Sequence, residues 1–381
     1  MGIGYLPKLT FVIAGVTLMA QHGFIFAEEP LIFVSSFASG DQGAIQAFTL
    51  NEKTATLKAL HRTAGVENPF FMAVSPDHKF LYSIYAPTFG GTEPEQVAAF
   101  RIEGRSGMLS PLNRQSTKGA ASCYLDVDAT GKSVLLANYS TGSVASYSVQ
   151  PDGSLSEPVS FVQHHGSSVD AARQKEPHAH CFVISPNNRF AYSADLGIDQ
   201  IVCYTLDPAK AKLAPNQPPF VRTPVGGGPR HLTFHPNGKL MYVINELKNS
   251  VTLFDFVPES GLLTERQTIS TLPADFAGTS HTADLKITPN GRYLYGTNRG
   301  HDSIAAYRIA EDGTLSLIEI TSSLGKGPQN LAITNDGSLL LCANMPGNNV
   351  AIFRIHADTG MLASAGEPVA IQGPSCLRIL E

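Results

Sequence analysis

The stretch GPRHLTFHPNGKLMYVINELKNSV has an alternating apolar pattern that predicts a plain β-hairpin, but it carries charge at two strand ends. Arg230 stands just before the apolar run of the first strand, and Glu246 stands just after that of the second. A guanidinium group binds a carboxylate, a phosphate or a developing oxyanion through paired N–H donors. A carboxylate can hold such a group in place or accept a proton. The pair therefore indicates either a structural salt bridge or a site for an anionic ligand.

Residues of similar chemistry flank two neighbouring apolar runs. His178 and His180 precede one of them in EPHAHCF, while His281 precedes the other and Arg299, with nearby His301, follows it. Histidine is the side chain best suited to proton transfer near neutral pH. These residue types could together bind an anion and move a proton, provided that the fold brings them to one place.

The elements that must position these residues recur along the chain. The turns SPDHK, DATGK, SPNNR, HPNGK, TPNGR and TNDGS follow successive strands at steps of 46 to 57 residues. Proline presets φ in such turns, and Asn-Gly or Asp-Gly tolerates the positive φ needed between hairpin strands. Each turn leads into a second strand, a third strand and a weaker fourth strand. Four antiparallel strands at a period near fifty, with no helical pattern between them, predict the blades of a β-propeller.

The two ends of the chain complete the blade count. Residues 31–63 match the second, third and fourth strands of the repeat, but no first strand precedes them. The C-terminal GPSCLRIL matches the first strand, with nothing after it. The sequence therefore predicts an all-β fold, a seven-bladed β-propeller of four-stranded antiparallel blades, with the ring closed by the C-terminal strand beside residues 31–37.

The start of each first strand and the end of each second strand lie at the same edge of an antiparallel blade. These ends should therefore converge around one mouth of the central channel, a concave place of the kind that binds ligands. Blades four to six would supply its charged residues, and blades two and three an aromatic wall of Phe70, Phe71, Tyr85, Tyr124 and Tyr139. The Asn or Asp that ends each second strand, Asp195 included, is expected to be structural. His164 and His165 are expected in a solvated loop.

The first 27 residues differ from the rest of the chain. One charge, Lys8, precedes the apolar run 9–20, and Ala27 offers a small residue before EEP. This pattern predicts a signal peptide over residues 1–27, a mature N-terminus at Glu28 and a single domain over 28–381. The expected location is periplasmic or secreted, with no membrane association after cleavage. If Phe24–Ala27 extends the apolar run, the segment would instead remain as an anchor.

Composition excludes several other classes of protein. The chain of 381 residues has a net charge of −5, so it lacks the basic surface of a nucleic-acid-binding protein. Its five cysteines have wide spacing and no CxxC pair, and we expect them to be small buried side chains rather than a disulfide framework or a zinc site. The expected state is a monomer.

At this point the motifs resemble a known family. GPRHLTFHPNGKLMYVINELKNSV, PHAHCFVISPNNRFAYSADLGIDQIVCY and TNRGHDSIAAYRIAEDGTL are similar to those of the seven-bladed lactonase family over nearly the whole of residues 31–380. The family includes propeller-type 6-phosphogluconolactonases and fungal 3-carboxy-cis,cis-muconate cycloisomerases. The resemblance implies a catalytic group of one His, two Arg and one Glu, which here would be His178, Arg230, Glu246 and Arg299.

The choice between two histidines stays open at this stage. His180 competes with His178, because it stands six residues before the turn residue Pro186, as Arg230 does before Pro236. Met345 stands where a polar residue would be expected, so the shape of the substrate could differ. The residues expected to bind substrate around the catalytic group are His180, His231, His281 and His301.

The resemblance implies a lactonase that hydrolyses a sugar lactone, similar to a 6-phosphogluconolactonase, at the channel mouth. His178 or Glu246 would deprotonate the water, and arginine would stabilise the oxyanion and bind the acidic part of a small-molecule lactone or sugar acid. No metal or other cofactor is expected, because the carboxylates are too scattered for an oxygen-rich cation site. The alternatives are a carboxymuconate-type cycloisomerase and a non-enzymatic exported propeller that binds a partner.

Overall fold

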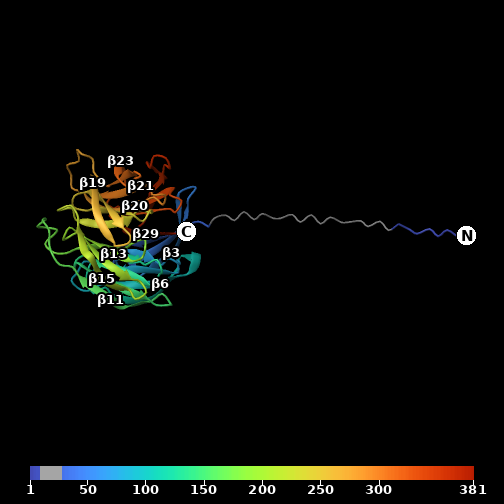
Figure 1. Cartoon of the computed structure of the whole chain (residues 1–381), viewed down its shortest axis with the longest axis horizontal. Helices are drawn as coiled ribbons and strands as arrows, with labels where there is room; N and C mark the ends of the chain where they lie inside the picture. The colour runs from blue at the N-terminus through green and yellow to red at the C-terminus, as the bar shows by residue number, and fades with distance from the viewer. Residues whose placement is uncertain (9–27) are drawn as a thin grey trace.

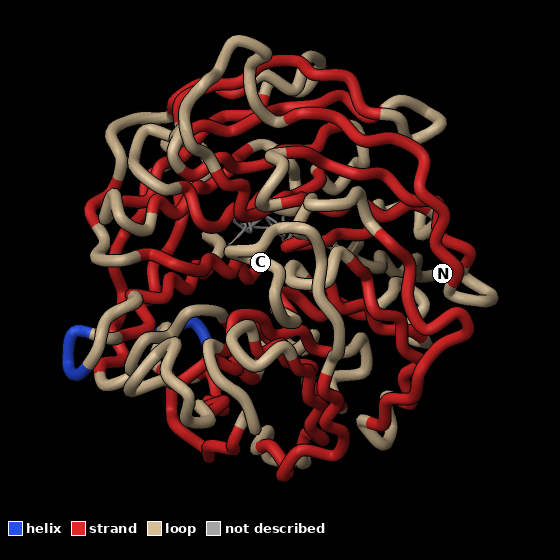
Figure 2. The backbone as a smooth tube through the Cα atoms, turned by 90° about the vertical axis from the view of Figure 1, so that its left-hand side faces the viewer, coloured by secondary structure: helices blue, strands red, loops and turns tan. Residues whose placement is uncertain are grey.

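The computed structural model of the chain describes residues 1–8 and 28–381, so most of the predicted signal segment lies outside the described residues. Figure 2 shows a chain of strands and loops, in which the helical pieces are the short 3-10 turns η1 (Gly40–Gln42) and η2 (Gly104–Ser106). The all-β prediction is confirmed. Within the described residues, no helix has both the length and the apolar character needed to cross a membrane.

The strands form seven antiparallel sheets, each of which is one blade of the described propeller. The split blade consists, from the inside outward, of β29 (Pro374–Leu380), β1 (Leu31–Ser36), β2 (Ala44–Asn51) and β3 (Thr56–Ala64). In the same order, blade two consists of β4 (Met72–Val74), β5 (Phe80–Tyr85), β6 (Gln96–Ile102) and β7 (Leu109–Ser116). Blade three consists of β8 (Ser122–Val127), β9 (Ser133–Asn138), β10 (Ser143–Val149) and β11 (Leu155–Gln163). Blade four consists of β12 (Ala179–Ile184), β13 (Phe190–Asp195), β14 (Gln200–Asp207) and β15 (Lys212–Arg222). Blade five consists of β16 (Pro229–Phe234), β17 (Leu240–Asn245), β18 (Ser250–Val257) and β19 (Leu262–Ser270). Blade six consists of β20 (His281–Ile287), β21 (Tyr293–Arg299), β22 (Ser303–Ile309) and β23 (Leu315–Ser322). Blade seven consists of β24 (Pro328–Ile333), β25 (Leu339–Asn344), β26 (Asn349–Ile355) and β27 (Leu362–Ser364), and β28 (Val369–Ala370) also pairs with β26.

The innermost strands close a ring. Each contacts the next in the order β29, β4, β8, β12, β16, β20, β24 and back to β29. Figure 1 shows the chain colour passing around the ring from blue to red, with the C-terminus beside the N-terminal strands. The closure is antiparallel, with Leu31 opposite Leu380 and Val34 opposite Leu377. The predicted seven-bladed ring closed by the C-terminal strand is therefore confirmed.

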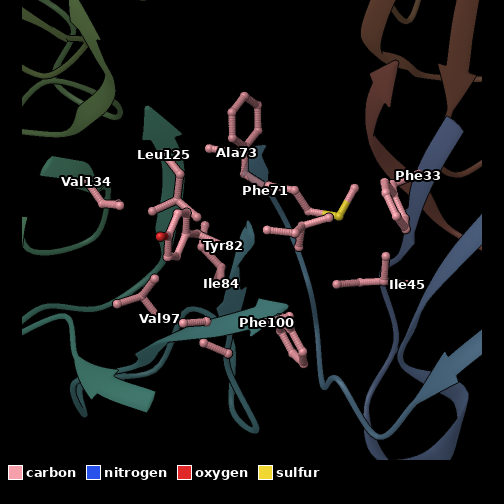
Figure 3. Close-up of a cluster of buried hydrophobic side chains, with 14 of the residues drawn as sticks. Phe33, Ile45, Phe71, Ala73, Tyr82, Ile84, Val97, Phe100, Leu125 and Val134 are labelled. Atoms are coloured by element: carbon pink, nitrogen blue, oxygen red, sulfur yellow. The ribbon is translucent and has the colours of Figure 1, made fainter. Parts of the chain in front are cut away.

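The core lies in layers between neighbouring blades rather than in one central mass. The second strands β9, β17 and β25 are buried at every residue, because both of their faces pack against other blades. Figure 3 shows one such layer, in which Phe33 and Ile45 of the split blade face Phe71 and Phe100 of blade two. All five cysteines are buried free thiols, as expected from the sequence.

Candidate active site

Strand pairing brings the charged residues of blades five and six to one edge of the ring. In blade five, Pro229 at the start of β16 pairs with Asn245 at the end of β17, so Arg230 and Glu246 lie at the same edge. In blade six, His281 at the start of β20 lies opposite Arg299 at the end of β21. The register of each blade therefore delivers these side chains to a single mouth.

Glu246 is the centre of a charged cluster at this mouth. Its Oε1 accepts a hydrogen bond from Arg173 Nη2 at 2.6 Å. Its Oε2 accepts two more, from Arg230 Nε at 3.0 Å and from Arg299 Nη2 at 2.8 Å. Burial opposes the charge on Glu246, but Arg299, Arg230 and Arg173 outweigh burial and lower the pKa of this carboxyl to about 2. Glu246 is therefore an anion at neutral pH and holds three guanidinium groups together.

Arg230 is the most enclosed member of the cluster, with 1% of its surface exposed. Burial, together with the positive charge of Arg299, lowers its pKa to about 10, while Glu246 acts in the opposite direction. Arg230 thus remains charged at neutral pH. A buried guanidinium in contact with a buried carboxylate is stable only because each compensates the other.

Arg173 was not foreseen from the sequence. It lies in the loop between β11 and β12, outside the repeating strands, and also donates to the Tyr139 hydroxyl at 3.1 Å. The repeat pattern identifies strand ends, and a residue in an inserted loop has no equivalent position in other blades. Its proximity in sequence to the His178 motif is the only signal that could have drawn attention to it.

The two candidate histidines occupy different places. His180 lines the cavity beside Arg230, Glu246 and Arg299, and its buried Nδ1 has no hydrogen-bond partner among the described residues. Burial, followed by the charge of Arg230, lowers the pKa of His180 well below its usual value. His180 is therefore a neutral imidazole at neutral pH, with one buried ring nitrogen that no described residue contacts by a hydrogen bond.

His178 lies one layer away from that cavity. Its Nδ1 donates to the Tyr139 carbonyl oxygen at 3.0 Å, because a carbonyl can only accept. Its ring stacks on that of Tyr139, with the ring centroids 4.5 Å apart. Tyr139 itself lines the cavity, whereas His178 supports it from behind. The structure therefore places His180, rather than His178, beside the arginines.

The other predicted histidines are dispersed. His231 lies beneath the cavity and donates from Nδ1 to Asp284 Oδ1 at 2.9 Å. His281 lines a neighbouring cavity that also contains Arg299. His301 bonds to the Ser303 hydroxyl at 2.7 Å and is not brought to either cavity.

The residues of the predicted aromatic wall lie in three different places. Phe70 and Tyr139 line the cavity, together with Phe89 from a loop. Phe71 and Tyr124 stack on each other below it, with ring centroids 4.3 Å apart. Tyr85 points elsewhere and donates to Glu67.

One expectation about the loop before blade four is wrong. His164 is not solvated but buried, with Nδ1 2.7 Å from Asp195 Oδ2 and Nε2 2.7 Å from the Tyr204 hydroxyl. Asp195 also accepts from the backbone N–H groups of His178 and Gly197. Asp195 therefore has the structural role expected of it and uses His164 as a partner, whereas His165 is exposed.

The cavity above Glu246 has a volume of about 180 Å³. A second cavity of about 740 Å³, lined by Gln329 and Met345 among others, shares Arg299 with it. Among residues 1–8 and 28–381, no group of three or more His, Cys, Asp and Glu side chains is arranged to hold a metal ion.

Comparisons with known proteins agree with this architecture. The profile of the family described as "Lactonase, 7-bladed beta-propeller" matches residues 31–379. A 6-phosphogluconolactonase of Bacillus subtilis is 33% identical over 356 residues, which cover 91% of this chain and 97% of that protein. A 6-phosphogluconolactonase of Formosa agariphila is 30% identical, covering 91% and 99% respectively. The solved structure of a periplasmic gluconolactonase of Pseudomonas aeruginosa has a TM-score of 0.86 and 28% identity, covering 93% of this chain and 99% of that one.

Proposed function

The chain belongs to the seven-bladed β-propeller lactonase family, and from this premise we propose that it hydrolyses a sugar lactone at the mouth described above. The observation that carries the proposal is the cluster of three arginines around one buried Glu246, beside the neutral His180. Three guanidinium groups against one carboxylate leave excess positive charge facing the cavity. Such a cavity favours an anionic substituent on the substrate and the oxyanion formed during ester cleavage.

Glu246 is a poor candidate for the base. Both of its oxygens already accept hydrogen bonds from arginines, so this carboxylate is engaged in binding cations rather than free to take a proton from water. Its three hydrogen bonds instead suit a group that fixes the arginines in place. The base in this proposal is His180, which is neutral and lines the cavity. His178 supports Tyr139 and acts only through it.

The reaction then follows from these positions. His180 takes a proton from a water molecule as the water oxygen attacks the lactone carbonyl carbon. Negative charge moves to the carbonyl oxygen, where Arg230 and Arg299 stabilise it. The tetrahedral intermediate collapses, the ring C–O bond breaks, and the protonated His180 returns its proton to the leaving alkoxide. The product is the open hydroxy acid, and every proton is accounted for.

The substrate class proposed is an aldonolactone carrying hydroxyl groups and, through the arginines, an acidic substituent. Relatives are named both for a phosphorylated and for an unphosphorylated gluconolactone, so both belong in the assay. These names do not favour the cycloisomerase alternative.

The test is acid release from a panel of lactones by the purified protein, with glucono-1,5-lactone and its 6-phosphate as the first pair. Arg230→Met should abolish most of the activity, whereas His301→Ala, outside both cavities, should retain it. If the wild-type protein hydrolyses no lactone above the spontaneous rate, the proposal fails and a binding propeller becomes the better interpretation.

We also propose export, with cleavage after Ala27, and a monomeric mature domain over residues 28–381. The support is the apolar segment before Glu28 and the periplasmic relative of the same fold. N-terminal sequencing of the protein from the periplasmic or culture fraction should begin at Glu28. Recovery of protein that starts at Met1 from the cytoplasm alone would contradict export.

A further inference from the structure

A buried chain of three polar side chains, Arg230, His231 and Asp284, extends inward from the proposed site. Arg230 Nη1 lies 3.3 Å from His231 Nε2, and His231 Nδ1 lies 2.9 Å from Asp284 Oδ1. All three side chains are buried to at least nine-tenths. None of the reaction steps above uses His231 or Asp284.

The five N–H donors of Arg230 can be assigned one by one. Nε–H goes to Glu246, and the two Nη1 protons go to the Ala283 carbonyl oxygen and to His231 Nε2. Nη2 has no hydrogen-bond partner among the described residues, and Arg230 lines the cavity. The two Nη2 protons are thus the pair that a substrate oxygen can meet.

The hydrogen bonds of Arg230 determine which ring nitrogen of His231 carries the proton. Arginine can only donate, so Nε2 of His231 must accept and carry no proton. The single imidazole proton then lies on Nδ1 and is donated to Asp284. Burial, and then Arg230, lower the pKa of His231 to about 3, so this neutral tautomer persists through the assay range.

Asp284 is held as an acceptor by several donors. Lys286 Nζ contacts both of its oxygens, at 2.9 and 2.7 Å, and Asn330 Nδ2 and the Leu331 N–H donate to Oδ2 at 2.7 and 2.9 Å. Burial opposes its charge, but Lys286 and then His231 lower the pKa of this carboxyl well below its usual range. Asp284 therefore offers His231 a lone pair and no proton.

We infer that Asp284 and His231 are positioning residues for lactone hydrolysis. By selecting the tautomer with an unprotonated Nε2, Asp284 makes His231 an acceptor for Arg230 Nη1, which aims Nη2 at the developing oxyanion. With Asp284→Asn, the amide oxygen meets the donors Asn330 and Leu331, so its NH₂ faces His231. The imidazole proton then moves to Nε2 and opposes Arg230 Nη1, which turns the guanidinium away.

The first test is spectroscopic and independent of activity. Two-bond ¹H–¹⁵N correlation spectra of protein with labelled histidine should show His231 protonated on Nδ1 between pH 5.5 and 8, and His231→Gln identifies its signal. Asp284→Asn should move the proton to Nε2. The matched control is Asp126→Asn, a channel carboxylate bonded to the Ile184 and Val127 N–H groups and to no arginine of the mouth. A wild-type His231 protonated on Nε2 would overturn the inference.

The second test is kinetic and rests on the proposed function. Asp284→Asn and His231→Leu should each lower kcat by about 10- to 100-fold, with a smaller change in KM, because an oriented donor is lost chiefly in the transition state. His231→Gln supplies both an amide donor and a carbonyl acceptor and should recover most of kcat. Should Asp284→Asn fail to fold, the Leu and Gln variants of His231 still decide the matter. Full activity of His231→Leu would overturn the inference and leave the proposed lactonase intact, whereas inactivity of the wild type and Asp126→Asn would instead count against lactone hydrolysis itself.

Discussion

Replacing Glu246 with glutamine tests whether this carboxylate is a structural anchor for the arginines or the catalytic base. Glutamine keeps the shape but removes the charge that compensates Arg230, whose side chain is 1% exposed. Breaking a buried ion pair costs about 3–5 kcal/mol in unfolding free energy. The other two partners, Arg173 and Arg299, are 34% and 27% exposed, so solvent screens them and each adds at most about 1 kcal/mol.

The pKa shift of Glu246 on folding gives a second value for the stability that its charge contributes. The pKa of Glu246 falls from 4.5 to about 2 on folding. A shift of that size corresponds to roughly 3 kcal/mol of stability. Because the folded pKa is the lower one, this stability is present above about pH 4.5 and is lost as the pH falls through about 2. This value lies at the lower end of the range expected for breaking the ion pair.

Urea unfolding of wild type and Glu246→Gln at pH 7 should therefore differ by about 3–5 kcal/mol, and the difference should shrink towards pH 2. In the Arg230→Met background, the cost of the same change should fall to about 1–2 kcal/mol. Asp255→Asn, which breaks an exposed pair with Arg266, is the control and should cost less than about 1 kcal/mol. A Glu246→Gln protein that is as stable as wild type at pH 7, and at every lower pH, would refute the reasoning.

Further predictions concern catalysis and closure of the ring. His180→Gln should lower kcat by about 10²–10⁴-fold, whereas His178→Gln should cost less than about 10-fold; the reverse order in a lactone assay would return the role of base to His178. The kcat/KM of the wild type should fall with acidity only below the usual histidine pKa, because the pKa of His180 is lowered and its neutral form is required. Arg299→Met should raise KM roughly 10-fold through loss of a charged donor shared by both cavities, as initial-rate kinetics would show. Deletion of residues 374–381 should abolish cooperative thermal unfolding, because it removes the inner strand of the split blade, whereas deletion of Glu381 alone should not; a truncated protein that still unfolds cooperatively would contradict the closure.

The fold was predictable because repetition makes its signal strong. The turn motif occurs at the same position in six successive repeats. Asn188, Gly238, Gly291 and Gly337 are the fourth residues of four of these turns and have positive φ, which explains why Asn and Gly recur at that position. The split blade was predictable because each end of the chain carries the part that the other lacks. Antiparallel pairing then determined which strand ends share an edge, as Pro229 opposite Asn245 illustrates.

The site was less predictable where it depends on non-repeating chain or on contacts between blades. Arg173 comes from an inserted loop, and its closeness in sequence to the His178 motif does not predict that it reaches Glu246 across the mouth. His164 looked solvated because its loop is polar, but tertiary contacts with Asp195 and Tyr204 bury it. Protonation states could not be predicted from the sequence either, because the low pKa of Glu246 depends on three arginines from separate parts of the chain.

The choice between His178 and His180 shows what repeat register can decide. Most of the cavity wall comes from two positions of the repeat, counted from the second residue of each turn, such as Pro236 in HPNGK. One position lies six residues before that residue, and the other lies ten residues after it. The wall residues at these positions are Phe70, Cys123, His180 and Arg230 for the first, and Tyr139, Glu246 and Arg299 for the second. His180 belongs to this register and His178 does not, which agrees with their places in the structure. The same register places Ala283 and Gln329 at the first position, where they accept hydrogen bonds from Arg230 and Arg299. A ring of equivalent strand ends thus becomes a site through variation at two positions, while the residue that ends the second strand, as in Asn245 and Asn298, keeps its structural bonds in blade after blade.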